Sequence, residues 1–180
     1  MCTEEDCDKL RRLIHYVTGT MDLIACVGAT DLLVLMHFID AAYAIYNDFR
    51  SHIGSTTTLG YGIVYSMSPK QKININSSTH AELVSVSNYF PKLLYAKLFL
   101  KVQDIALKRN IMYQDNTSVM LMKKNRKLSC SKRSCHLNTR YFYVMNTVKQ
   151  KEMEIMHYPK EVIITNFFLK PLQGNLFKRF

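Results

Sequence analysis

Residues 70–102 read KQKININSSTHAELVSVSNYFPKLLYAKLFLKV, and the spacing of the apolar residues changes within this segment. Over residues 70–76 polar and apolar residues alternate, which is typical of a half-buried strand. From Thr79 to Val102 the spacing becomes helical, and we expect one side of this helix to be apolar. Pro91 interrupts the pattern, so we expect a kink or two abutting helices. The apolar side would consist of Leu83, Val86, Phe90, Leu94 and Leu98.

Two further strands are predicted upstream of this segment. Residues 34–39 form a short apolar run, and residues 59–65 are rich in glycine and in β-branched or aromatic side chains. With residues 70–76 they predict an antiparallel meander of three strands. Residues 10–16 are typical of the end of a helix.

The remaining pattern changes between strand and helix. Strands are predicted at residues 111–113 and 153–158, and helical spacing occurs over residues 116–123 and 137–148. A final helix is expected after Pro159. This order predicts an α/β fold, in which helices pack on the faces of a mixed sheet.

The composition is that of one globular domain. The chain has 180 residues, of which 48% are hydrophobic and 21% charged, so disorder and collagen-like repeats are excluded. The longest candidate apolar run, residues 32–39, contains His37 and is far shorter than the ~18 residues that a membrane span needs. The chain begins MCTEEDCD, which is acidic where a secretory signal would be basic. We therefore expect a protein without a membrane partner, in the reducing interior of a cell.

The five cysteines are expected to remain thiols there. Cys2 with Cys7, and Cys130 with Cys135 and His136, form loose groups with a spacing of five residues. A structural zinc site usually needs four ligands at C-x₂₋₄-C spacing, so we do not expect zinc.

Positive charge is concentrated in the last third of the chain. The net charge is +10, and residues 121–180 hold thirteen Lys and Arg against three Asp and Glu, whereas the earlier residues are balanced. Such density favours a polyanion, either nucleic acid or an acidic membrane surface, although a solvated loop would have the same composition. The densest run, without an acid, contains Lys123, Lys124, Arg126, Lys127, Lys132 and Arg133.

Three acidic residues stand where an active site can form. Asp40 and Asp115 each end a predicted strand, and Glu82 lies in the first turn of the long predicted helix. Ligands of open α/β sheets collect near strand ends, so the three side chains can converge. Converged carboxylates repel one another and are tolerated mainly where they hold divalent cations. Two such ions activate a water and stabilise the leaving oxygen of a phosphodiester.

Each acid also has a structural interpretation. Thr79 and Glu82 fit a capping box, in which the glutamate accepts a hydrogen bond from the backbone at the start of the helix. Asp115 can cap the helix expected after it, and Asp40 can close a turn. The spacing alone leaves both interpretations open.

Several segments that contain these acids match one family in order. The chain resembles the ribonuclease H region at the C-terminal end of the Pol polyprotein of copia-type LTR retrotransposons. The resemblance runs from about residue 10 to the C-terminus. The matching segments are IDAAYA (39–44), RSHIG (50–54), KQK (70–72), SSTHAEL (77–83), YQDN (113–116), HLNTRY (136–141) and KPLQG (170–174).

The resemblance implies a ribonuclease H-like fold with a five-stranded mixed sheet flanked by helices, over residues 34–180. Residues 1–33 would be a remnant of the segment that connects the reverse transcriptase to this domain. The implied activity is metal-dependent endonucleolytic hydrolysis of the RNA strand of an RNA:DNA hybrid. Asp40, Glu82 and Asp115 would be catalytic groups and ligands of two Mg²⁺ ions, with Mn²⁺ as a substitute.

The fourth catalytic position departs from the family pattern. The family block has the form Ala-Asp-Phe-Phe-Thr-Lys-Pro, whereas this chain has Asn166 in place of the aspartate. An amide oxygen can still face a metal but brings no negative charge, so the ions would be held more weakly and the rate reduced. Two alternatives follow: a catalytically inactive nucleic-acid-binding remnant of the polyprotein, or a decayed reading frame that folds poorly.

The resemblance also suggests the partners. The basic run from Lys123 to Arg133, with His136 and Arg140, would contact the phosphates of an RNA:DNA hybrid. The reverse transcriptase part of the parent polyprotein would be a second partner, and we expect a monomer in the cytoplasm and the nucleus. No polymerase, protease or integrase motif is present, so we expect a fragment of an element that starts at a chance methionine.

Overall fold

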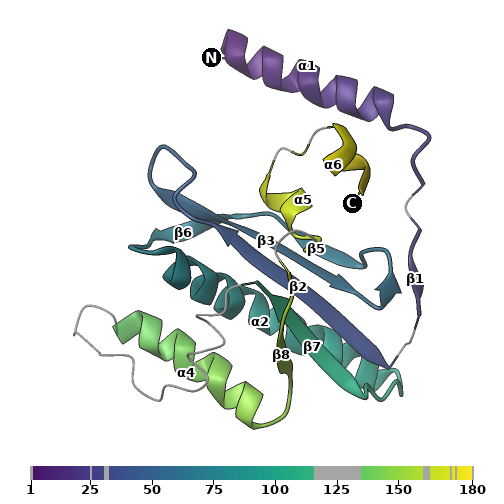
Figure 1. Cartoon of the computed structure of the whole chain (residues 1–180), viewed down its shortest axis with the longest axis vertical. Helices are drawn as coiled ribbons and strands as arrows, with labels where there is room; N and C mark the ends of the chain where they lie inside the picture. The colour runs from purple at the N-terminus through teal and green to yellow at the C-terminus, as the bar shows by residue number, and fades with distance from the viewer. Residues whose placement is uncertain are drawn as a thin grey trace.

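The computed structural model describes residues 2–24, 26–30, 33–115, 135–159, 163–170, 172 and 174–179. In the described part of the chain, α1 is followed by six strands, and helices and strands then alternate from α2 to α5, which gives the α/β fold that the sequence predicts (Figure 1). The helices are α1 (Glu4–Gly19), α2 (Ser78–Val102), α4 (Cys135–Lys149), α5 (Asn166–Leu169) and α6 (Gly174–Arg179). The strands are β1 (Gly28–Ala29), β2 (Val34–Ala42), β3 (Arg50–Thr58), β4 (Gly60–Tyr61), β5 (Tyr65–Met67), β6 (Lys70–Asn74), β7 (Arg109–Gln114) and β8 (Glu154–His157).

The main sheet is mixed. Its order is β5-β3-β2-β7-β8, and β6 pairs with the same strand as β5, so the sheet is five strand positions wide. β3 lies antiparallel to β2, β5 and β6, whereas β7 lies parallel to β2 and β8 parallel to β7. The predicted mixed sheet flanked by helices is therefore confirmed.

The middle strand of the predicted meander lies earlier in the chain than expected. The prediction placed it at residues 59–65, but the long second strand is β3, which ends at Thr58. Residues 59–65 hold only β4, a turn and the first residue of β5, because Gly60 and Gly62 adopt positive φ angles of 134° and 68°. Glycine reaches these angles readily, and they break the extended backbone there.

α2 is one continuous helix through Pro91, so two abutting helices are not formed. Its first half is buried, including Leu83, Val86 and Phe90 of the predicted apolar side. Its last turns are more exposed. Leu98, which was predicted to lie on the apolar side of the helix, is 58% exposed. The buried residues of α2 run from Ala81 to Leu93, and Leu94 still packs against the core, so Leu98 lies one turn beyond the buried part of the helix.

The hydrophobic core lies between the sheet, α2 and α4. It contains Ile39, Val86, Tyr89, Phe90, Leu93, Met112, Val144 and Met153. α5 contacts β2 and β3 on the other side of the sheet, as Figure 1 shows. Gly54 permits this contact, because a Cβ there would lie 2.7 Å from Leu169 Cγ and 3.0 Å from the carbonyl oxygen of Thr165.

The N-terminal segment contains a longer helix than the sequence indicates. α1 begins after Thr3, whose side chain accepts a hydrogen bond from Asp6 N–H in a capping box. It buries none of its residues, although the ring of Tyr16 contacts that of Phe177 edge-on. β1 then pairs with β4, and the division of the chain at residue 33 stays a prediction. Among the described residues, none of the helices has the length and apolar character needed to cross a membrane.

Candidate metal centre

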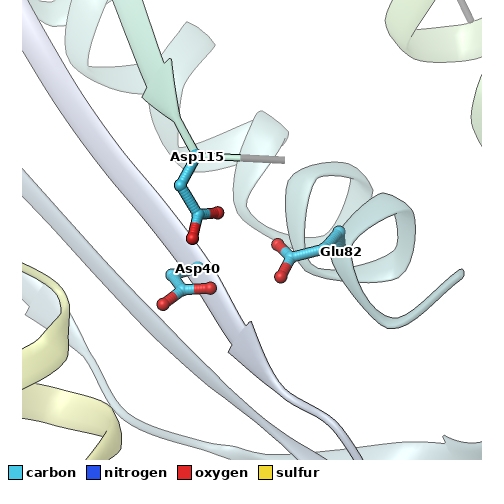
Figure 2. A group of neighbouring side chains, drawn as sticks. All are labelled: Asp40, Glu82 and Asp115. Atoms are coloured by element: carbon cyan, nitrogen blue, oxygen red, sulfur yellow. The ribbon is translucent and has the colours of Figure 1, made fainter. Parts of the chain in front are cut away.

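The three predicted acids lie together at one end of the sheet. Asp40 comes from β2, Asp115 follows β7 directly and Glu82 is in the second turn of α2. Each offers a carboxylate oxygen, and these oxygens lie within 4.8 Å of one another. Figure 2 shows the three carboxyl groups directed toward a common point.

The parallel pairing of β2 with β7 explains how residues so far apart in sequence meet. Phe38 pairs with Tyr113, and two residues further along each strand bring the chain to Asp40 and Asp115. Glu82 approaches from the adjacent helix, because α2 packs on β2. The strand-end argument from the sequence therefore describes the geometry correctly, whereas the catalytic and metal-binding roles of these residues stay predictions.

Backbone and amide groups hold two of the carboxylates. The N–H of Ala41 donates to Asp40 Oδ1 at 2.7 Å and also lies 3.3 Å from Glu82 Oε1. The side-chain amide of Gln114 donates to Glu82 Oε2 at 3.0 Å. Asp40 and Glu82 are each 5% exposed, so their charges are largely removed from water.

This burial has an electrostatic consequence. Desolvation raises the pKa of Glu82 well above its usual value. The charge of Asp40, a hydrogen bond with that carboxyl group and the charge of Asp115 raise it further, while the hydrogen bond from Gln114 lowers it. Like charges gathered in a buried site favour either a shared proton or a bound cation.

The capping interpretation of Glu82 is wrong. The helix is capped by Ser77, whose hydroxyl accepts a hydrogen bond from His80 N–H at 3.3 Å. Glu82 instead bonds to Ala41 and Gln114, which lie on the sheet. Its place on α2 is therefore explained by the acidic site rather than by the end of the helix. The helix that Asp115 was expected to cap lies outside the described residues.

Asn166 lies in the first turn of α5 and is buried. Its side-chain oxygen accepts a hydrogen bond of 2.7 Å from Lys170 Nζ, one turn further along the chain. The amide oxygen that the sequence offers as a fourth ligand is therefore occupied by a cationic donor.

The predicted phosphate contacts are only partly described. Lys123, Lys124, Arg126, Lys127, Lys132 and Arg133 lie outside the described residues, and so does the side chain of His136, although its backbone is in α4. Arg140 is described: its Nη1 donates to Asn88 Oδ1 at 2.6 Å and to Ser87 Oγ at 3.4 Å. This guanidinium therefore connects α4 to α2, and its role toward nucleic acid stays a prediction.

Sequence reasoning missed Gln114 as a member of the site. It lies next to Asp115, but a lone glutamine has no spacing signal, and only the fold shows that its amide reaches Glu82. A polar residue at the end of a buried strand, beside a candidate ligand, is the signal that would have indicated it.

The whole chain aligns with long proteins of plant transposons. It is 28% identical over 182 aligned positions to the retrovirus-related Pol polyprotein from transposon RE1 of Arabidopsis thaliana. It is 27% identical to the corresponding protein from transposon RE2 of the same plant. Both alignments cover 100% of this chain and 12% of the relative. The chain is homologous to transposon Pol polyproteins. It spans about an eighth of their length, and no family model matches it.

The fold agrees with this homology. The chain superimposes on LC11-RNase H1, isolated from compost by a metagenomic approach, with a TM-score of 0.51 and 14% identity, over 72% of this chain and 86% of that one. It also superimposes on LC11-RNase H1 in complex with RNA/DNA hybrid, with a TM-score of 0.52 and 15% sequence identity. That superposition covers 75% of this chain and 92% of the other. The transposon-related chain therefore has a ribonuclease H fold, in which the acidic cluster is at one end of the sheet.

Proposed function

We propose that this chain is the ribonuclease H domain of a copia-type LTR retrotransposon Pol polyprotein and that it hydrolyses the RNA strand of an RNA:DNA hybrid. One observation carries the proposal: three acids from β2, α2 and the end of β7 converge within 4.8 Å on a ribonuclease H fold. The RNA/DNA complex of LC11-RNase H1 supports the class of substrate. Residues 1–33 would then be the joint to the reverse transcriptase part.

The donor set fits a divalent cation. All three side chains offer hard carboxylate oxygens, which suit Mg²⁺ and Mn²⁺. Their burial and mutual repulsion raise the pKa of Glu82, and a cation would relieve that repulsion. When bound, such ions lower the pKa of a water and stabilise the leaving oxygen of a phosphodiester.

The residues of the chain hold this site in place. Asp40, Glu82 and Asp115 would bind the ions, and the N–H of Ala41 orients the first two carboxylates. The basic residues from Lys123 to Arg133 would bind the phosphates of the hybrid, with a salt-dependent affinity. Contacts to 2′-hydroxyl groups would distinguish RNA from DNA.

The test is cleavage by the purified chain. We expect the labelled RNA strand of a hybrid to be cut in Mg²⁺ or Mn²⁺, and duplex DNA of the same sequence to stay intact. Asp40→Asn should abolish cutting while the variant still melts cooperatively. If wild-type protein binds the hybrid but cuts no RNA at high Mn²⁺, the chain is a catalytically inactive nucleic-acid-binding remnant. A monomer in the cytoplasm and the nucleus would accord with the proposed activity.

A further inference from the structure

The side chain of Gln114 lies completely buried at the end of β7 and donates a hydrogen bond of 3.0 Å to Glu82 Oε2. We propose that Gln114 is a positioning residue of the metal site, whose amide fixes the orientation in which Glu82 presents its carboxylate to a divalent cation. The inference rests on the function proposed above and adds a residue to it. Groups that hold a metal ligand in place typically change metal affinity by about 10- to 100-fold when they are removed.

Among the three acids, the amide of Gln114 donates to Glu82 alone. The N–H of Ala41 also donates to this carboxylate, but it is shared with Asp40. Its shorter hydrogen bond, 2.7 Å, goes to Asp40 Oδ1, and its distance to Glu82 Oε1 is 3.3 Å. Glu82 has a long side chain with several rotatable bonds, so its carboxylate would turn more freely if the amide were lost.

The backbone of Gln114 is also held in place by the sheet. β7 lies between β2 and β8, and the carbonyl oxygen of Gln114 accepts a hydrogen bond of 2.9 Å from Tyr158 N–H. Gln114 pairs with His157 in the parallel register of β7 and β8. The main chain is therefore held by β8 at Gln114 and by β2 at Tyr113, one residue earlier, immediately before Asp115. One short segment thus supplies both a candidate ligand and the group that orients another.

The chemistry of an amide suits this position. It is neutral, so it adds no repulsion to the three acids, and unlike lysine or arginine it does not replace the cation electrostatically. Gln114 Oε1 accepts no hydrogen bond from the described part of the chain, and an unpaired buried carbonyl destabilises a fold. Methionine has a similar shape without that cost, so the donor bond to Glu82 is what glutamine provides here.

Gln71 offers a matched control. It is also buried, and its Nε2 donates to Ala81 O at 2.9 Å and Ser85 Oγ at 3.0 Å on the same helix, α2. Its Oε1 likewise has no partner among the described residues. It therefore shares the burial, the amide chemistry and the helix contact of Gln114, but its amide donates to none of the three carboxylates.

The experiment compares Mn²⁺ binding by the full chain, Gln114→Met and Gln71→Met, measured by calorimetry without nucleic acid. We expect the dissociation constant to rise about tenfold in Gln114→Met and to change less than twofold in Gln71→Met. Thermal melts in EDTA report the structural effect of each substitution separately. Equal Mn²⁺ affinity in wild type and Gln114→Met, or an equal loss in both variants, overturns the inference.

A second measurement needs no variant. In wild-type protein, the side-chain amide signals of Gln114 in the nitrogen–proton correlation spectrum should move as Mg²⁺ is added, while those of Gln71 stay in place. Signals of Gln114 that do not respond overturn the inference even if Gln114→Met fails to fold. Wild-type protein that binds neither Mn²⁺ nor Mg²⁺ contradicts the proposed function itself, and the positioning role with it.

Discussion

Lys170 Nζ donates a 2.7 Å hydrogen bond to the side-chain oxygen of Asn166. An ammonium group is therefore bound to the amide oxygen of the residue that stands where the copia-type pattern has its fourth catalytic aspartate. Asn166→Asp would restore a carboxylate there. We expect the Mg²⁺ concentration for half-maximal hybrid cleavage to fall roughly tenfold, because a charged ligand binds the cation more strongly than an amide. The measurement is a metal titration of RNA-strand cleavage.

Lys170→Met distinguishes the effect of the ammonium group from the effect of the missing carboxylate. It removes the ammonium donor and its positive charge beside Asn166, so a smaller fall in the Mg²⁺ requirement is expected. If Asn166→Asp needs as much Mg²⁺ as wild type and cuts no faster, the fourth position contributes nothing in this chain.

Glu82→Gln should stabilise the metal-free protein and remove its stabilisation by Mn²⁺. The substitution keeps the shape of the side chain and deletes one of three converged charges, two of which are buried. Ligand binding to the native state raises stability by mass action, so Mn²⁺ should raise the melting temperature of wild type and not of the variant. Without metal the variant should melt a few degrees higher than wild type, because each kcal/mol of added unfolding free energy raises the melting temperature of a chain of this size by about 2–4 °C.

The same variant has a defined pH signature. The pKa of Glu82 is raised in the folded state, so the folded protein binds a proton that the unfolded chain has released. Its contribution to stability is therefore present at low pH and is lost as pH rises through the folded pKa. In EDTA, the advantage of Glu82→Gln over wild type should grow as pH increases above 4.5, the ordinary value. An advantage that does not change with pH would contradict this.

The sequence predicts the acidic site better than the sheet that supports it. Asp40 and Asp115 end apolar runs, and parallel pairing of those runs is a general consequence of an α/β order. β3 was missed because its residues Ser55, Thr56 and Thr57 are polar yet fully or nearly fully buried, which the apolar periodicity cannot indicate. The partners of such residues come from distant elements, as when Tyr89 of α2 bonds to Thr57.

Contacts between side chains were also beyond prediction. The bond between Gln114 and Glu82 joins residues 32 positions apart, and it depends on how α2 packs on the sheet. The pair of Lys170 with Asn166 depends on one helical turn of α5, too short to have a periodic pattern. Residue types can nominate ligands, but the groups that orient or compete with them follow from packing.

Gly54→Ala should destabilise the fold by about 1–3 kcal/mol. The added Cβ would lie 2.7 Å from Leu169 Cγ and 3.0 Å from Thr165 O, so α5 must move away from β3. α5 carries Asn166, the predicted fourth catalytic position, so the substitution should displace that residue as well. Urea unfolding gives the change in free energy.

Gly19→Ala is the matched control for that substitution. A Cβ at Gly19 meets nothing within 4 Å, and this residue ends α1, where alanine favours helix by up to about 1 kcal/mol. Its stability should equal or exceed that of wild type. If Gly54→Ala unfolds at the same urea concentration as Gly19→Ala, α5 does not pack against β3 closely enough to exclude a methyl group at position 54.

A buried hydrogen-bond chain crosses the sheet at His37. Tyr89 OH and Thr57 Oγ1 lie 2.6 Å apart, Thr57 Oγ1 is 2.8 Å from His37 Nδ1, and His37 Nε2 is 2.8 Å from Asn110 Oδ1. An amide oxygen only accepts, so Nε2 carries the proton and Nδ1 accepts from the threonine hydroxyl. Burial lowers the pKa of His37 to about 3, although the bond to Asn110 acts in the opposite direction.

This histidine should make the protein sensitive to mild acid. Below pH 6.5 the unfolded chain binds a proton at His37 that the folded chain does not, so stability falls as pH decreases from 6.5 toward 3. Between pH 7.5 and 5.0 wild type should lose about 2 kcal/mol more than His37→Gln, at about 1.4 kcal/mol per pH unit. Urea unfolding of both proteins at the two pH values measures the difference. Both proteins contain Glu82, so its contribution to the pH dependence is the same in each and drops out of the comparison. Parallel losses in the two proteins would show that His37 is protonated as readily in the folded chain as in the unfolded one.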